Sequence, residues 1–100
     1  MSTISLESSV TINEDIIARE LDGETVILNL SSGTYFGLDP VGTRVWQLLE
    51  SKCSLKQVFD TMGQEFEVDA AMLEADLLRL VTHFCRDGLV SQSAPEAGEK

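Results

Sequence analysis

Alternating apolar and polar residues in the first third of the chain predict three β-strands, over residues 16–21, 24–30 and 34–38. Asp22-Gly23, between the first two, tolerates positive φ at both positions and is typical of a two-residue hairpin. Residues 31–33 end in Gly33, which suits a left-handed turn position. Connections this short join antiparallel neighbours, so we expect a three-stranded antiparallel meander.

A shorter alternating stretch, residues 10–12, precedes these strands and is either an extra edge strand or an ordered arm. Within residues 24–30 the apolar side chains are divided between the two faces of the strand, because side chains alternate with a period of two. One face carries Val26, Leu28 and Leu30, and the other carries Ile27 and Asn29.

From residue 39 onward apolar residues recur every three or four positions, the spacing of amphipathic helices. Asp39-Pro40 is typical of a helix start, with an N-cap acceptor before a proline at the first helical position. We expect this first helix to end near Lys52. Its apolar stripe consists of Val41, Val45, Leu48 and Leu49, with Trp46 beside them.

Two more helices follow. Ser54 with Gln57 forms a possible capping box for the second, and Asp69 caps the third, which Gly88 ends. Leu89-Val90 can pack back onto the domain, whereas residues 91–100 have no large apolar side chain and are predicted to be a disordered tail. The apolar stripe of the second helix is predicted to consist of Leu55, Val58, Phe59, Met62 and Phe66. The pattern predicts one α+β domain over residues 1–90, a three-stranded sheet followed by three helices.

The charge balance excludes several kinds of partner. With 17 Asp and Glu against 7 Lys and Arg, the net charge is −10. This charge disfavours nucleic acid and anionic membrane surfaces. The chain has neither an apolar run near the ~20 residues of a membrane span nor a signal peptide at its start. We therefore expect a cytoplasmic protein.

The third helix has an unusually wide apolar stripe of about 160°, whereas one packing partner needs roughly 100°. Either all of it is core, or one flank lines a groove beside the third strand, at Leu73, Asp76 and Leu80. The stripe consists of Leu73, Leu77, Leu78, Leu80, Val81, Phe84 and Cys85.

The third strand, residues 34–38, is the last of the meander, so one of its edges is a candidate for an unpaired edge. It lacks the lysine, proline or bulge with which proteins usually protect such edges. An open edge beside an apolar groove favours binding of an extended peptide by strand addition.

Three segments resemble the PqqD-like proteins, a family that includes the coenzyme PQQ synthesis protein D and the recognition elements of ribosomally made, modified peptides, lasso peptides among them. The first is residues 28–39, LNLSSGTYFGLD, and the second is residues 41–49, VGTRVWQLL. The third is the closing pattern Asp76-Leu77-Leu78, Leu80-Val81, Phe84 and Gly88-Leu89-Val90.

The resemblance implies a winged-helix-like fold that binds the leader of a precursor peptide on the third strand, against the third helix. It further implies a separate partner enzyme: a radical SAM enzyme in PQQ synthesis, or a leader peptidase in lasso pathways. Neither a cofactor nor a metal is expected, and a homodimer through the open edge stays possible. The implied peptide contacts are Thr34, Tyr35, Phe36, Gly37, Leu73, Asp76, Leu77 and Leu80.

Three other functions fit the sequence less well. An enzyme needs a nucleophile with a base, a metal cluster or a cofactor loop, yet His83 is the only histidine and is expected on the surface. A winged-helix DNA binder needs a basic recognition helix, but the second and third helices are both net acidic. A generic acidic adaptor remains the main alternative. Cys53 and Cys85 are expected to be reduced thiols, with a disulfide or a reactive thiol as the alternatives.

Overall fold

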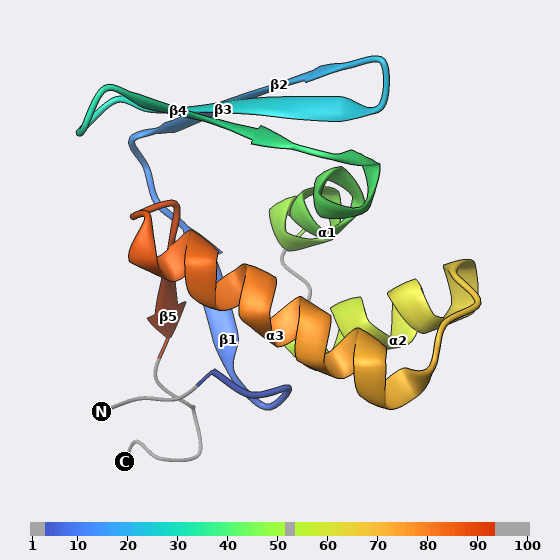
Figure 1. Ribbon diagram of the computed structural model, residues 1–100. Coiled ribbons are helices and arrows are strands. Elements are labelled where there is room, and N and C mark those ends of the chain that lie inside the picture. Colours follow the sequence, from blue (N-terminus) through green and yellow to red (C-terminus); the bar gives the residue numbers. More distant parts are fainter. Residues whose placement is uncertain (1–3, 52–53, 94–100) are drawn as a thin grey trace.

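The computed structural model describes residues 4–51 and 54–93 and contains the predicted strands and helices in the predicted order (Figure 1). It adds a short strand at each end of the described chain. The elements are β1 (Ser9–Ile12), β2 (Ile16–Leu21), β3 (Glu24–Asn29), β4 (Thr34–Leu38), α1 (Pro40–Glu50), α2 (Leu55–Glu65), α3 (Ala70–Arg86) and β5 (Val90–Ser93).

The central sheet is antiparallel, in the order β2-β3-β4. Asp22 and Gly23 have φ of 54° and 82°, the conformation of the predicted two-residue hairpin. Gly33, with φ of 74°, closes the second turn and donates its N–H to the carbonyl of Asn29 at 2.7 Å. The meander was therefore predicted correctly, because its turn residues determine the local connections.

The sheet buries the β3 face that carries Thr25, Ile27 and Asn29, while Val26 on the other face is 41% exposed. α1 and α3 lie on the buried side of the sheet, and the opposite side faces away from them (Figure 1). The face of β3 that carries most of its apolar residues is therefore the one that faces solvent.

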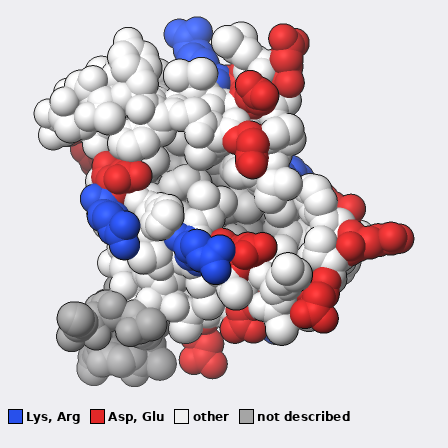
Figure 2. Space-filling model, viewed as in Figure 1, with Lys and Arg blue, Asp and Glu red and all other residues white. Residues whose placement is uncertain are grey.

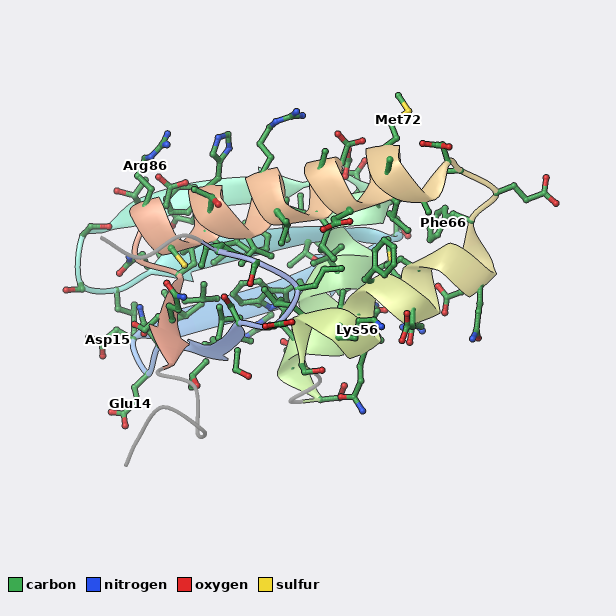
Figure 3. All side chains as sticks on the ribbon, turned by 90° about the horizontal axis from the view of Figure 1, so that it is seen from below. Glu14, Asp15, Lys56, Phe66, Met72 and Arg86 are labelled. Carbon is green, nitrogen blue, oxygen red and sulfur yellow. The ribbon has the colours of Figure 1, made fainter. Side chains whose placement is uncertain are left out.

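The core lies between this sheet and the helices. Trp46 and Phe84 meet edge to face, with ring centroids 5.4 Å apart and planes at 90°, and the Trp46 indole N–H donates to Glu50 at 3.1 Å. Phe66, at the end of α2, points in between α2 and α3, whereas Met72 projects outward from α3 (Figure 3). The fully enclosed side chains are Trp46, Ile27, Leu55, Met62, Leu89, Val45, Val58, Val81 and Val90.

The predicted helix signals are all present. The Asp39 side chain caps α1, Ser54 and Gln57 form the complete capping box of α2, and Asp69 caps α3. Gly88 has φ of 77° directly after α3. Lys52, near which α1 was expected to end, lies outside the described residues, and α1 ends at Glu50.

A second, two-stranded sheet joins the ends of the described chain. β1 contains the predicted stretch 10–12, and it pairs with β5 from Ser9↔Ser93 to Ile12↔Val90. Ordered structure therefore extends three residues beyond the boundary predicted at residue 90, because Ser91, Gln92 and Ser93 pair with β1. The remainder of the predicted tail, residues 94–100, lies outside the described residues.

Candidate functional site

β4 is an edge strand, because over the described part of the chain it pairs with β3 alone. In an antiparallel ladder, successive residues of an edge strand direct their backbone groups alternately toward the neighbour and away from it. Which residues of β4 point outward is therefore decided by the register of the sheet.

The register can be read from two hydrogen-bonded pairs of β2 and β3. The Leu30 N–H donates to the Asp15 carbonyl at 2.8 Å, and Leu21 and Glu24 close the two-residue hairpin. The even-numbered residues of β3 therefore bond to β2 and the odd-numbered ones to β4. Since Ile27 is opposite Phe36, the backbone of Phe36 is directed to β3.

The same alternation leaves Tyr35 and Gly37 with N–H and C=O groups that point away from the sheet. We call these groups the open edge of β4. The Tyr35 side chain is 69% exposed, and Gly37 has open space where a Cβ would be. No proline, lysine or bulge protects this edge, so it can accept another strand.

A hollow of about 390 Å³ lies between the end of β4, the start of α1 and the middle of α3. Figure 2 looks into the surface between the sheet and α3, where most of the visible surface is uncharged. The hollow is within the roughly 300–1,000 Å³ of ligand-binding pockets. Its lining residues are Gly37, Leu38, Asp39, Val41, Gly42, Asp76 and Leu80.

The hollow has an apolar floor and an acidic rim. Leu38 and Leu80 are half-buried, and Val41 is 47% exposed. The Asp39 carboxylate accepts the Gly42 N–H at 2.8 Å, which fixes the start of α1, and Asp76 pairs with Arg79 at 3.2 Å. A side chain that enters here meets aliphatic carbon below and carboxylates at the opening.

Of the predicted site residues, the hollow brings together Gly37, Asp76 and Leu80, and the open edge consists of Tyr35 and Gly37. Leu73 lies one turn away on α3, close to Gly63 of α2. Leu77 differs from the prediction, because it is 3% exposed and belongs to the core. It occupies the centre of the wide α3 stripe with Val81 and Phe84, so it supports the hollow from below.

The width of the α3 stripe has a structural explanation on both flanks. Leu80 on one flank faces the hollow. On the other flank Leu78 and Cys85 are half-buried against the core, and Ile4 of the N-terminal arm lies beside Cys85. The arm is therefore a second partner for this helix, and the sequence pattern did not predict it.

The predicted site residues did not include four that line the hollow, Leu38, Asp39, Val41 and Gly42. A signal for them was present, because the strand–cap–helix junction places the first turn of α1 directly after the open edge. Gly42 permits a close approach, since a Cβ there would lie 3.3 Å from Leu38 Cβ and from Asp39 Oδ1.

Arg44 connects the helices beside the site. Its guanidinium donates to both carboxylate oxygens of Glu65, at 2.9 and 2.7 Å, and to Gln47 at 3.1 Å. The hydrogen bond from Arg44 lowers the pKa of Glu65, so the ion pair is present above the usual carboxyl range and is lost as the pH falls through the lowered value. Gln47 in turn donates to Glu20 of β2 at 2.6 Å.

The structure places the two side chains that were considered for catalytic or thiol chemistry, His83 and Cys85. His83 is exposed in the last turn of α3, and burial raises the pKa of the Cys85 thiol, which disfavours the reactive thiolate. Cys53 lies outside the described residues. Within residues 4–51 and 54–93 no group of three His, Cys, Asp or Glu side chains could hold a metal ion, and no helix is long and apolar enough to cross a membrane.

The comparisons with known proteins agree with this architecture. Residues 24–90 match the family model of coenzyme PQQ synthesis protein D, PqqD, so the chain belongs to the PqqD family. No curated protein matches the sequence.

Two solved structures share the fold. One is described as TbiB1 in complex with the TbiA(beta) leader peptide; its TM-score is 0.81 at 34% identity, over 84% of this chain and 98% of that one. The other is described as lasso peptide synthetase B1 complexed with the leader peptide, with a TM-score of 0.75 at 26% identity, over 82% and 96% of the two chains.

Proposed function

We propose that this chain binds the leader segment of a ribosomally made precursor peptide and delivers it to a separate modifying enzyme or leader peptidase. The observation that carries the proposal is the open edge of β4 beside the hollow. The two similar structures support it, because both are described as complexes with leader peptides. A lasso-type pathway is favoured over a PQQ-type one, because one of the two is described as lasso peptide synthetase B1.

The leader adds as a further strand on β4 and extends the sheet. Tyr35 and Gly37 offer four outward backbone groups, which contribute about 2–6 kcal/mol at roughly 0.5–1.5 kcal/mol for each hydrogen bond. One aliphatic leader side chain in the hollow adds about 1.5–3 kcal/mol. Their sum is about 3.5–9 kcal/mol, and the ordering of the peptide costs about 2 kcal/mol or more, so the binding is micromolar at its tightest.

Each proposed contact residue has a distinct role. Tyr35 and Gly37 supply the backbone pairing, while Thr34 and Phe36 hold β4 onto β3 and border the peptide with their side chains. On α3, Leu80 and Asp76 contact the leader, and Leu73 extends the apolar surface toward α2. Leu77 acts only through packing.

The chain itself performs no reaction in this proposal. The partner enzyme supplies the chemistry, and the recognition domain contributes affinity and position. We place the complex in the cytoplasm, where the precursor is synthesised and where thiols such as Cys85 stay reduced.

A proline variant tests whether the leader binds at the open edge of β4. Tyr35→Pro removes the outward N–H and places the ring on the open edge; because this N–H is not part of the β3·β4 ladder, the domain should stay folded. We expect the affinity for the leader of the precursor encoded beside this chain to fall at least tenfold, measured by fluorescence anisotropy with a labelled leader peptide.

Two control variants separate the edge from other effects. Tyr35→Thr keeps the N–H and a strand-forming side chain, and should weaken binding by less than threefold. Ala18→Pro places proline at the equivalent outward position of β2, the opposite edge of the sheet, and should leave binding unchanged. Undiminished leader binding by a folded Tyr35→Pro variant would contradict strand addition at β4, whereas no leader binding by the unmodified chain would favour a generic adaptor.

A further inference from the structure

The side of the central sheet that faces away from the helices is apolar. We call it the outer face, and its residues are those whose side chains alternate away from the core. Ile17, Leu28 and Tyr35 form a continuous row across the three strands. Ile17 is 43% and Val26 is 41% exposed, and Leu21 is exposed to 65%. Leu30 extends the same side of the sheet beyond β3, and the only charged strand residues on the outer face are Arg19 and Glu24.

This composition is unusual for an exposed sheet face. Antiparallel sheets with one solvated side normally show polar residues there. Contiguous apolar surface on an otherwise strongly charged molecule marks an interaction site. In a chain with a net charge of −10, a nearly uncharged face that spans three strands therefore indicates a binding partner.

The outer face continues directly into the proposed leader site. Side chains of a strand that adds to β4 alternate, so every second leader side chain is directed to the side of the sheet that carries the hollow and α3, and the side chains between them join the outer face beside Tyr35. The leader would therefore form the last strip of the outer face. A partner seated on this face contacts the domain and the leader at the same time.

We propose that the outer face, completed by the bound leader, is the docking surface for the enzyme that processes the precursor. This inference rests on the proposed function. In this proposal the leader side chains that face α3 bind this chain, and those on the other side bind the enzyme. The enzyme can then distinguish the domain with bound leader from the domain without it.

The charges around the outer face specify the partner's chemistry. Asp22 lies at the hairpin end of the sheet, and Glu14 and Asp15 project at the other end (Figure 3). An apolar patch with a basic rim is complementary to this surface. A second copy of the chain is the wrong occupant, because it would bring one acidic rim against another, with a net charge of −10 on each molecule.

Two charge variants test this docking surface. Val26→Glu places a carboxylate in the middle of the outer face, and Val68→Glu is the matched control, because Val68 is 52% exposed in the turn between α2 and α3. The probe is a purified enzyme chosen from those encoded beside this chain. It is the one that processes the precursor only when this chain is added. We expect Val26→Glu to lower the processing rate at least tenfold, and Val68→Glu to change it less than twofold.

Leader binding is measured separately, by fluorescence anisotropy, for both variants. It should stay within about threefold of the unmodified chain, since Val26 is on β3, one strand in from the open edge, and its side chain is on the opposite side of the sheet from the hollow. Equal processing by the two variants would overturn the docking surface and leave the leader site intact. If no such enzyme depends on this chain, or if unmodified chain binds no leader, the proposed function itself fails. A monomer–dimer shift on Val26→Glu in sedimentation would assign the face to self-association instead.

A scan of the leader tests the composite nature of the surface. The leader residues in contact with β4 are replaced one at a time by aspartate. The variants at every second position, where the side chain faces α3, should bind this chain less tightly. The intervening positions should retain that affinity within threefold and slow processing at least fivefold. The enzyme should also bind the loaded domain at least tenfold more tightly than the empty one. Equal binding to both forms would rule out a surface completed by the leader.

Discussion

Asn29 is a buried side chain that joins the sheet to the end of α3. Its carbonyl oxygen accepts the N–H groups of Ser31 and Ser32 in the turn before β4, and its amide donates to the Asp87 carbonyl at 3.3 Å. Asn13 makes a similar connection, since its amide donates to the Gly88 carbonyl at 2.7 Å. The two amides place the end of α3 against the sheet that carries the open edge.

Gly88 is the residue on which this junction depends. Gly88 and Gly33 have nearly the same positive φ, 77° and 74°, but only at Gly88 would a Cβ meet another atom, the Asn29 amide nitrogen at 3.2 Å. Alanine at either position costs about 1–2 kcal/mol of backbone strain. We expect Gly88→Ala to lower the free energy of unfolding by up to about 1.5 kcal/mol more than Gly33→Ala, because the Asn29 amide must shift and its hydrogen bond to Asp87 is weakened as well. Urea denaturation of the two variants measures this difference, and equal midpoints would contradict it.

At the scale of elements, the local signals were read correctly, whereas two long-range features were left open. The hairpin turn, the three N-caps and the Gly88 stop each depend on a few adjacent residues, so their positions follow from the sequence. The buried face of β3 and the pairing of β1 with β5 depend on residues far apart in the chain. Val26 and Leu30 are apolar yet exposed, which no pattern within one strand distinguishes from a core position.

The site shows the same division. The open edge and the α3 flank could be proposed from a meander followed by helices, because a terminal strand has one unpaired side. The burial of Leu77 could not, since it depends on how α3 is rotated against Trp46 and the rest of the core. The first turn of α1 was missed although the Asp39-Pro40 helix start places it directly after the open edge; what the sequence does not show is that this turn lies opposite α3.

The strand β5 offers a test of its contribution to the fold. A chain that ends at Val90 loses the pairs of Ser91, Gln92 and Ser93 with β1, together with the Ser91–Asn13 hydrogen bond at 2.6 Å. We expect it to unfold with a free energy about 1–3 kcal/mol below that of a chain that ends at Ser93, given roughly 0.5–1.5 kcal/mol for each hydrogen bond. Chemical denaturation of the two truncated chains gives the comparison. The same stability for both would mean that β5 adds nothing to the domain.

At the scale of the whole molecule, the functional surfaces are arranged around one sheet. The buried face packs on α1 and α3, the open edge and the hollow form the proposed leader site, and the outer face extends from that edge. Binding of a leader would close the edge and add a strand to the sheet, so the folded state gains contacts that the unfolded chain lacks. Peptide binding and folding stability are therefore coupled.

This coupling gives a quantitative expectation for thermal unfolding. A ligand that binds only the folded state stabilises it by about 2.7 kcal/mol at a hundredfold excess over Kd. For a domain of this size that corresponds to a rise in Tm of roughly 10 °C or more, measured by calorimetry with the leader peptide. The Tyr35→Pro variant at the same peptide concentration should show little shift, whereas Val26→Glu should shift as the unmodified chain does, because the outer face does not hold the leader by itself. An unchanged Tm of the unmodified chain at saturating leader would separate binding from folding and contradict the addition of a strand to the sheet.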